Sequence, residues 1–222
     1  RITAGDFRSM IFPTQYRVPA YNRWLLHEAD LAPAYRWHRR YLEHLQSAHP
    51  VPQWLLKSPA HLWHLDAMTT EYPGAVVVQT HRDPLKVIAS VSALATSLRR
   101  MASDENSVAQ AAPGYADDIF LGLDRGMAFR DGPSAAAGRI IDVQYAEFLA
   151  DPLATVGRLY DDLGRPLTAD TERRMRAFLA GHPGDGGGGR YSFADTGLDA
   201  GAVRERARPY QERFGVASEP VV

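Results

Sequence analysis

The chain has 222 residues, of which 45% are apolar and 23% charged, so it falls in the range of one compact domain with an ample core. Its 25 basic and 26 acidic residues nearly cancel, which gives no global reason to expect nucleic acid as a partner and requires any anion site to be local. The sequence has no cysteine, which excludes disulfides, thiolate catalysis and cysteine-ligated metals. No segment reaches the roughly 18 apolar residues of a membrane span, and the first residues lack the apolar core of a signal peptide, so we expect a cytoplasmic protein.

The first part of the chain is predicted to be mainly helical. Apolar and aromatic side chains at helical spacing predict a helix over residues 31–48. The short apolar run "QWLLKS" at residues 53–58 follows, bounded by prolines, and predicts a buried strand. A further helix is expected over residues 60–71.

The clearest strand signal is "AVVVQTH" at residues 75–81. Its β-branched side chains follow one another without polar alternation, which predicts a strand covered on both faces of a parallel sheet. Asp83 is placed to cap the helix that follows directly in "PLKVIASVSALATSLRRM". Residues 102–115 are predicted to form a loop and residues 116–129 another helix.

The second half of the chain repeats this alternation. "GRIIDVQY" at residues 138–145 predicts a third buried strand. Asp151 then caps a helix that is expected to end at Gly164 in the left-handed conformation. Further helices are predicted over residues 170–180 and 199–213, on either side of a glycine-rich stretch at 181–190 with too little side chain to pack, which predicts a mobile loop.

The alternation of strands and helices predicts an α/β fold, a parallel sheet with helices on both faces, in a single domain. Ligands of such sheets bind at the carboxyl ends of the strands. Lys57 and His61 follow the first predicted strand, whereas Arg82 follows the second, and Ser90 lies two turns into the next helix. A forked guanidinium beside a hydroxyl suits a cluster of anionic oxygens.

Arg82, Lys57 and His61 also have ordinary structural explanations. An arginine before a helix-capping aspartate often forms a structural ion pair, Lys57 could extend out of the sheet, and His61 could bond to the backbone at a helix start. Residues 38–40, a histidine and two arginines, are predicted to form a solvated basic face. His64 stands three residues after His61, but no third ligand is nearby, so no metal site is expected.

Three segments occur in order over residues 50–166 and together resemble a known family: "WLLKSPAHL", "YPGAVVVQTHRDPLKVIASVSAL" and "IIDVQYAEFLADPLATVGRLYDDLGRPL". They resemble the sulfotransferases that use 3′-phosphoadenosine 5′-phosphosulfate (PAPS), and most closely the bacterial members with "LKSP-H" and "HRDP…S" segments. The resemblance implies a P-loop-like sulfotransferase fold. It also implies transfer of a sulfuryl group to a hydroxyl of a small-molecule, sugar or lipid acceptor, with adenosine 3′,5′-bisphosphate (PAP) as product and no metal.

The resemblance also implies roles for the residues of the predicted catalytic site. His61 matches the histidine that acts as general base on the acceptor hydroxyl, a task that suits a pKa near neutrality. Lys57 matches the lysine that stabilises charge near the transferring group.

Five residues match or approach the positions that hold the nucleotide in the family. Arg82 and Ser90 match the arginine and serine that bind its 3′-phosphate. Arg190, followed by Tyr191 and Ser192, falls where the family places further basic contacts to the same phosphate.

The sequence also departs from the family pattern. The N-terminal strand and its phosphate-cradling "G-T-T" or "G-S" loop are missing, and residues 1–50 instead resemble the helical region that lines the acceptor pocket. We therefore expect the C-terminal part of a longer enzyme, which carries half of the nucleotide site. Two rival hypotheses remain, a nucleotide-dependent kinase relative and a non-catalytic nucleotide-binding or interaction domain of the same fold.

Overall fold

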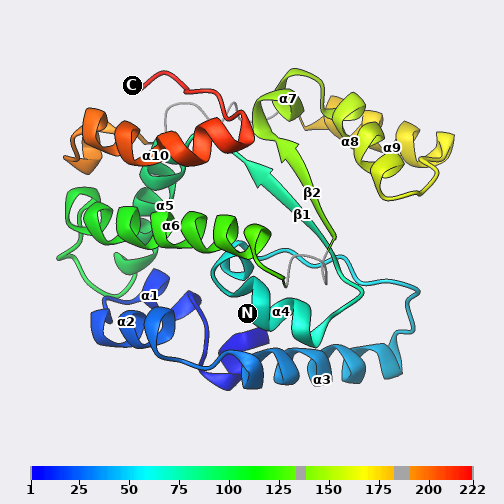
Figure 1. Cartoon of the computed structure of the whole chain (residues 1–222), viewed down its shortest axis with the longest axis horizontal. Coiled ribbons are helices and arrows are strands. Elements are labelled where there is room, and N and C mark those ends of the chain that lie inside the picture. The colour runs from blue at the N-terminus through cyan, green and yellow to red at the C-terminus, as the bar shows by residue number, and fades with distance from the viewer. Residues whose placement is uncertain (1, 134–138, 183–190, 222) are drawn as a thin grey trace.

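A computed structural model describes residues 2–133, 139–182 and 191–221 (Figure 1). In chain order its elements are η1 (Ile2–Asp6), α1 (Ile11–Gln15), α2 (Pro19–His27), α3 (Ala32–Ala48), η2 (Pro59–His64), α4 (Leu65–Glu71), β1 (Val76–His81), α5 (Pro84–Arg99), α6 (Val108–Asp131), β2 (Arg139–Gln144), α7 (Tyr145–Ala150), α8 (Pro152–Asp162), α9 (Ala169–Gly181), η4 (Ala194–Thr196) and α10 (Ala200–Phe214). None of the helices in these ranges combines the length and apolar character that a membrane span requires.

The two strands run parallel, with Val76 opposite Arg139 and His81 opposite Gln144. Between them the chain passes through α5 and α6, and helices flank the sheet (Figure 1), which confirms the predicted α/β fold with a parallel sheet. The expectation that β1 is covered on both faces is wrong, because Val76 and Val78 are each 40% exposed. In the described part of the chain the sheet is only two strands wide, so its covering layers do not enclose every position of β1.

The predicted strand at residues 53–58 is not formed, and this segment is an irregular connection between α3 and η2. Leu55 is 98% exposed and Leu56 is 43% exposed, so the apolar run is not a core element. A strand needs a neighbour with which to exchange backbone hydrogen bonds, and the prolines on either side remove donors from the segment. Lys57 therefore lies on a loop rather than at the end of a strand.

The helix boundaries follow their caps. Ser107 and Gln110 each accept a hydrogen bond from the other's backbone N–H, at 3.2 and 3.1 Å, and this capping box starts α6 at residue 108 instead of the predicted 116. The predicted cap of α5 is confirmed, since Asp83 Oδ1 accepts from the backbone N–H of Leu85 at 3.0 Å. Gly164 has the expected left-handed conformation, with φ of 66°.

Two core clusters hold the fold together. The first joins α5, α6 and α10 and includes Leu85, Ile88, Phe120, Ala207 and Tyr210. The second joins α2, α3 and α4 and includes Leu25, Ala34, Tyr35, Leu65 and Met68. Leu62 of η2 packs against both clusters, so the short helix that carries His61 and His64 is fixed between them.

Candidate functional site

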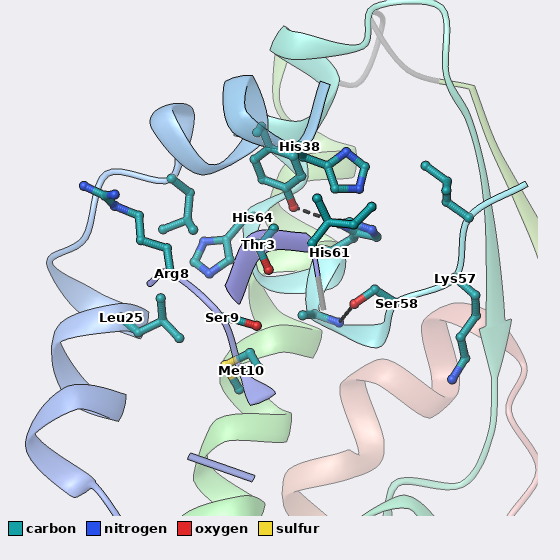
Figure 2. Close-up of a pocket in the computed structure, with 15 residues that line it drawn as sticks. Thr3, Arg8, Ser9, Met10, Leu25, His38, Lys57, Ser58, His61 and His64 are labelled. Atoms are coloured by element: carbon teal, nitrogen blue, oxygen red, sulfur yellow. Dashed lines mark hydrogen bonds between the residues drawn. The ribbon is translucent and has the colours of Figure 1, made fainter. Parts of the chain in front are cut away.

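The candidate site begins at η2, a 3₁₀ segment that carries two histidines. Ser58 Oγ accepts from the backbone N–H of Ala60 at 3.3 Å and caps the segment, and Pro59 occupies its first position. His64, the last residue of η2, has φ of −143° and ψ of 41°, which are not helical values. The rings of His61 and His64 therefore take different directions, on either side of Thr3 in Figure 2.

Both histidines line a cavity of about 110 Å³ between η2 and the N-terminal helical region (Figure 2). The apolar part of its wall includes Met10, Leu25 and Leu31. The polar groups that line it include Ser9, His38 and Lys57 as well as the two histidines. A small ligand that entered this space would meet both imidazole groups and aliphatic carbon.

A hydrogen bond from α3 fixes the ring of His61. Its Nδ1 lies 2.9 Å from the hydroxyl of Tyr35, which is itself only 3% exposed. Behind this pair, the Nδ1 of His38 lies 2.7 Å from the hydroxyl of Tyr72. The rings of His38 and His61 meet edge to face at 6.3 Å between centroids. His38 is 6% exposed, so the prediction that it lies on a solvated face is wrong, because α3 turns this side onto η2 and α4.

Burial keeps His61 and His64 neutral. It lowers the pKa of His61 from 6.5 to about 4, and the nearby imidazole of His38 adds to the effect. The pKa of His64 is also lowered to about 4, first by burial and then by the charge of Arg125. Burial raises the pKa of the Tyr35 hydroxyl, which therefore stays protonated. The expected pKa near neutrality is thus not found for His61, although its neutral form is the one that can accept a proton.

His64 differs from His61 in its hydrogen bonding. Its Nε2 is buried and has no hydrogen-bond partner among the described residues. Figure 2 shows the His64 ring in the space between Arg8, Thr3 and Ser9. A buried polar atom without a partner costs free energy unless water or a ligand reaches it, so this atom marks the cavity as a place where a polar group can bind.

Lys57 lines the same cavity from the loop before η2, but its side chain points away from the histidines (Figure 2). It is exposed to solvent. The structure thus brings Lys57 and His61 to one cavity without bringing the ammonium group to the imidazole.

A second part of the candidate site lies at the carboxyl end of β1. The guanidinium of Arg82 binds both carboxylate oxygens of Glu219, with Nε to Oε1 at 2.8 Å and Nη2 to Oε2 at 2.9 Å. The group also lies over the ring of Tyr145, 4.4 Å from its centroid. The hydrogen bonds to Glu219 raise the pKa of Arg82. Arg82 therefore already holds a planar anion at the strand end where a ligand anion was predicted.

The segment that carries Glu219 is attached at several points. The fully buried carboxylate of Asp83 accepts from the backbone N–H of Glu219 at 2.7 Å and from Nη1 of Arg204 at 2.7 Å. Arg204 also donates to the backbone carbonyl of Glu219 at 2.9 Å. Val216, 7% exposed, fixes the start of the segment in the first core cluster. Asp83 thus caps α5 and anchors the chain after α10 at the same time.

The other predicted nucleotide contacts are placed differently. Ser90 is half-buried in the second turn of α5. Tyr191 is also half-buried, and it lies near enough to Arg82 to contribute to the rise in the pKa of the guanidinium. The Ser192 hydroxyl accepts from the backbone N–H of Ala194 at 3.1 Å, at the start of η4. Arg190 and most of the predicted 181–190 loop lie outside the described residues.

Several residues that shape the site could not be chosen from the sequence. Tyr35 fits the helical stripe of residues 31–48, where packing explains it, and Tyr72 begins the segment "YPGAVVVQTH", where no pattern marks it as a partner of His38. Glu219 lies 137 residues from Arg82, with which it pairs, and no local sequence pattern links the two. In the described residues no group of three or more histidine or acidic side chains gathers in a way that could hold a metal ion.

Fold and site together define an α/β protein with a cation at the carboxyl end of a parallel strand and neutral histidines in a neighbouring cavity. The sequence model of the sulfotransferase family matches residues 1–170. The crystal structure of sulfotransferase STF9 from Mycobacterium avium superposes with a TM-score of 0.84 at 28% sequence identity. The match covers 96% of this chain and 55% of that one, so the chain spans about half the length of this relative. No curated protein sequence matches. The chain belongs to the sulfotransferase family.

Proposed function

We propose that the chain transfers a sulfuryl group from PAPS to a hydroxyl of a small-molecule, sugar or lipid acceptor. In this proposal residues 1–222 act as one sulfotransferase domain, the strand end at Arg82 holds the nucleotide, and the helical region of residues 1–50 lines the acceptor side. PAPS supplies the activated sulfuryl group, and PAP is the leaving group.

The forked pair between Arg82 and a carboxylate is the observation that carries the proposal. A guanidinium that binds two oxygens of a carboxylate can bind two oxygens of a phosphate in the same way. The 3′-phosphate would take the place of the Glu219 carboxylate on Arg82. Ser90, Arg190, Tyr191 and Ser192 are the further contacts that we propose for the nucleotide.

His61 is the group that we propose to remove the acceptor proton. If Nδ1 carries the proton and donates it to the Tyr35 oxygen, 2.9 Å away, the lone pair of Nε2 is free for the acceptor hydroxyl. His61 then takes the hydroxyl proton as the acceptor oxygen bonds to sulfur. The bond between sulfur and the phosphate oxygen breaks in the same step, and its electrons leave with PAP.

Lys57 is proposed to stabilise the negative charge that develops around the sulfuryl group. Because its side chain points away from His61 in the structure (Figure 2), it must change rotamer to do so. A long exposed side chain does this readily, within nanoseconds.

The proposal is tested by thermal unfolding of the chain with PAP and, separately, with ATP and magnesium. Stabilisation by PAP alone supports it, since a ligand that binds only the folded state raises its stability by mass action. Arg82→Ala should abolish this stabilisation, whereas Arg213→Ala, which removes an exposed ion pair with Asp131, should preserve it. Stabilisation only by ATP and magnesium would support the kinase relative, and no response to either would support a non-catalytic domain.

A further inference from the structure

The unpartnered nitrogen of His64 has no role in the reaction proposed above. Its Nε2 is buried without a hydrogen-bond partner in the described part of the chain, while the residue lines the same cavity as His61. Native proteins pair nearly all buried polar side-chain atoms, and exceptions often mark a bound water or ligand.

The two histidines reach different parts of the same cavity. Figure 2 shows the His64 ring among Arg8, Thr3 and Ser9, and the His61 ring on the other side of Thr3. His61 uses Nδ1 for its hydrogen bond to Tyr35, so its Nε2 is available to a ligand. The Nε2 of His64, which has no partner among the described residues, is available in the same way. The cavity therefore presents two neutral imidazole nitrogens at separate places in its wall, and each can either donate or accept, depending on its tautomer.

Another part of the cavity wall is aliphatic. Met10, Leu25 and Leu31 line the cavity, and its volume of about 110 Å³ is of the order of the about 150 Å³ apolar cavity that admits benzene. A six-membered carbon ring with polar groups on opposite sides matches this arrangement.

We propose that His64 is a binding residue that sets acceptor specificity. In this inference, which rests on the proposed function, the reacting hydroxyl of the acceptor lies at His61 and a second hydroxyl across a six-membered ring bonds to the Nε2 of His64. The acceptor is thus a ring with two hydroxyl groups rather than a simple alcohol or phenol.

The test compares two ligands that differ only in the second hydroxyl, cyclohexane-1,4-diol and cyclohexanol. Their dissociation constants for the full 222-residue chain are measured by NMR titration. The wild-type protein should bind the diol about threefold to tenfold more tightly, the effect of one net hydrogen bond. His64→Phe should lose this preference, and His64→Gln, whose amide can approach the position of Nε2, should retain part of it.

Three results would overturn the inference: equal binding of both ligands, which is expected if a water satisfies His64; binding of neither; or a preference that persists in His64→Phe. Thermal unfolding with PAP, measured on the same proteins, separates this inference from the proposed function. If PAP stabilises the wild-type protein and His64→Phe alike but the diol shows no preference, the acceptor inference alone fails. If PAP stabilises neither, the proposed function fails.

Discussion

The two parts of the candidate site treat charge in opposite ways. At the end of β1, Arg82 is paired with Glu219 and Asp83 with Arg204, all at 2.7 to 2.9 Å. In the cavity beside η2, the imidazoles of His61 and His64 stay uncharged near pH 7, because burial lowers the pKa of each to about 4. One region holds ions by pairing them, and the other excludes ionisation by burial.

This difference matches the two tasks of a group-transfer site. The ion pair of Arg82 with Glu219 is partly exposed, with side-chain exposures of 27% and 29%. Because exposed ion pairs are individually weak, a ligand anion can replace the Glu219 carboxylate on Arg82. A proton acceptor must instead remain neutral until the reaction, which burial ensures for His61. Variants that change one region and leave the other intact separate these two strategies.

The largest expected effect is on turnover. If His61 is the general base, His61→Ala should lower the rate of sulfuryl transfer from PAPS by about 100-fold to 10,000-fold, because the acceptor hydroxyl loses its proton acceptor. His44→Ala, which removes an exposed histidine of α3, is the matched control and should leave the rate unchanged. A loss below about tenfold for His61→Ala would exclude this role.

The second expected effect is on stability in acid. The pKa values of His61 and His64 fall from 6.5 in the unfolded chain to about 4 in the folded protein. Between these values the unfolded chain binds protons that the folded protein does not, so stability is complete above about pH 6.5 and decreases as the pH falls towards 4. With each unit worth about 1.4 kcal/mol, the two groups together should lower the free energy of unfolding by several kcal/mol.

Urea unfolding between pH 7 and pH 4 measures this loss. The double variant His61→Phe with His64→Phe should show a clearly smaller decrease over the same range, because neither aromatic ring takes up a proton. Equal pH dependence in the double variant and the wild-type protein would show that the cavity does not keep these histidines neutral.

The third expected effect concerns Tyr35. Tyr35→Phe removes the hydroxyl that fixes the Nδ1 of His61, so a smaller fraction of the imidazole has the tautomer with a free Nε2. We expect turnover to fall about tenfold, the value of a hydrogen bond of about 1.4 kcal/mol. ¹⁵N chemical shifts of His61 distinguish this effect from simple loss of packing, since the tautomer ratio should change in Tyr35→Phe. An unchanged ratio would show that Tyr35 does not position the base.

The fold was largely predictable because its signals are local. Asp83 starts a helix and Gly164 ends one, each through the chain within a few residues. The β-branched run of β1 likewise identifies a strand without information from distant parts of the sequence. The false strand at residues 53–58 shows the limit of such signals. Apolar character alone cannot tell whether a partner strand exists, and Leu55 proved to be almost fully exposed.

The site was less predictable because its contacts join distant parts of the chain. Arg82 and His61 could be proposed from motifs, but the groups that determine their states could not. Tyr35 comes from α3, and Glu219 comes from the segment after α10. The start of α6 was missed for a different reason, since Ser107 and Gln110 form a capping box within a stretch whose composition resembles a loop.

The smallest expected effect tests whether Glu219 and the nucleotide compete for Arg82. Glu219→Gln keeps the shape of the side chain but removes the charge that pairs with the guanidinium, so a phosphate would displace a weaker partner. We expect the dissociation constant of PAP to decrease about threefold to tenfold, in line with the modest value of a partly exposed ion pair. Titration calorimetry at low ionic strength, where the charge effect is screened least, measures the change.

Glu205→Gln is the control for charge alone, because Glu205 forms an exposed pair with Arg208 on α10 and should leave the affinity for PAP nearly unchanged. Weaker binding of PAP to Glu219→Gln would contradict competition and show instead that Glu219 holds Arg82 in the orientation that the phosphate requires. Tighter binding would mean that the ion pairing at the end of β1 is a reversible state of the anion site, whereas the neutrality of the histidine cavity is fixed by its burial.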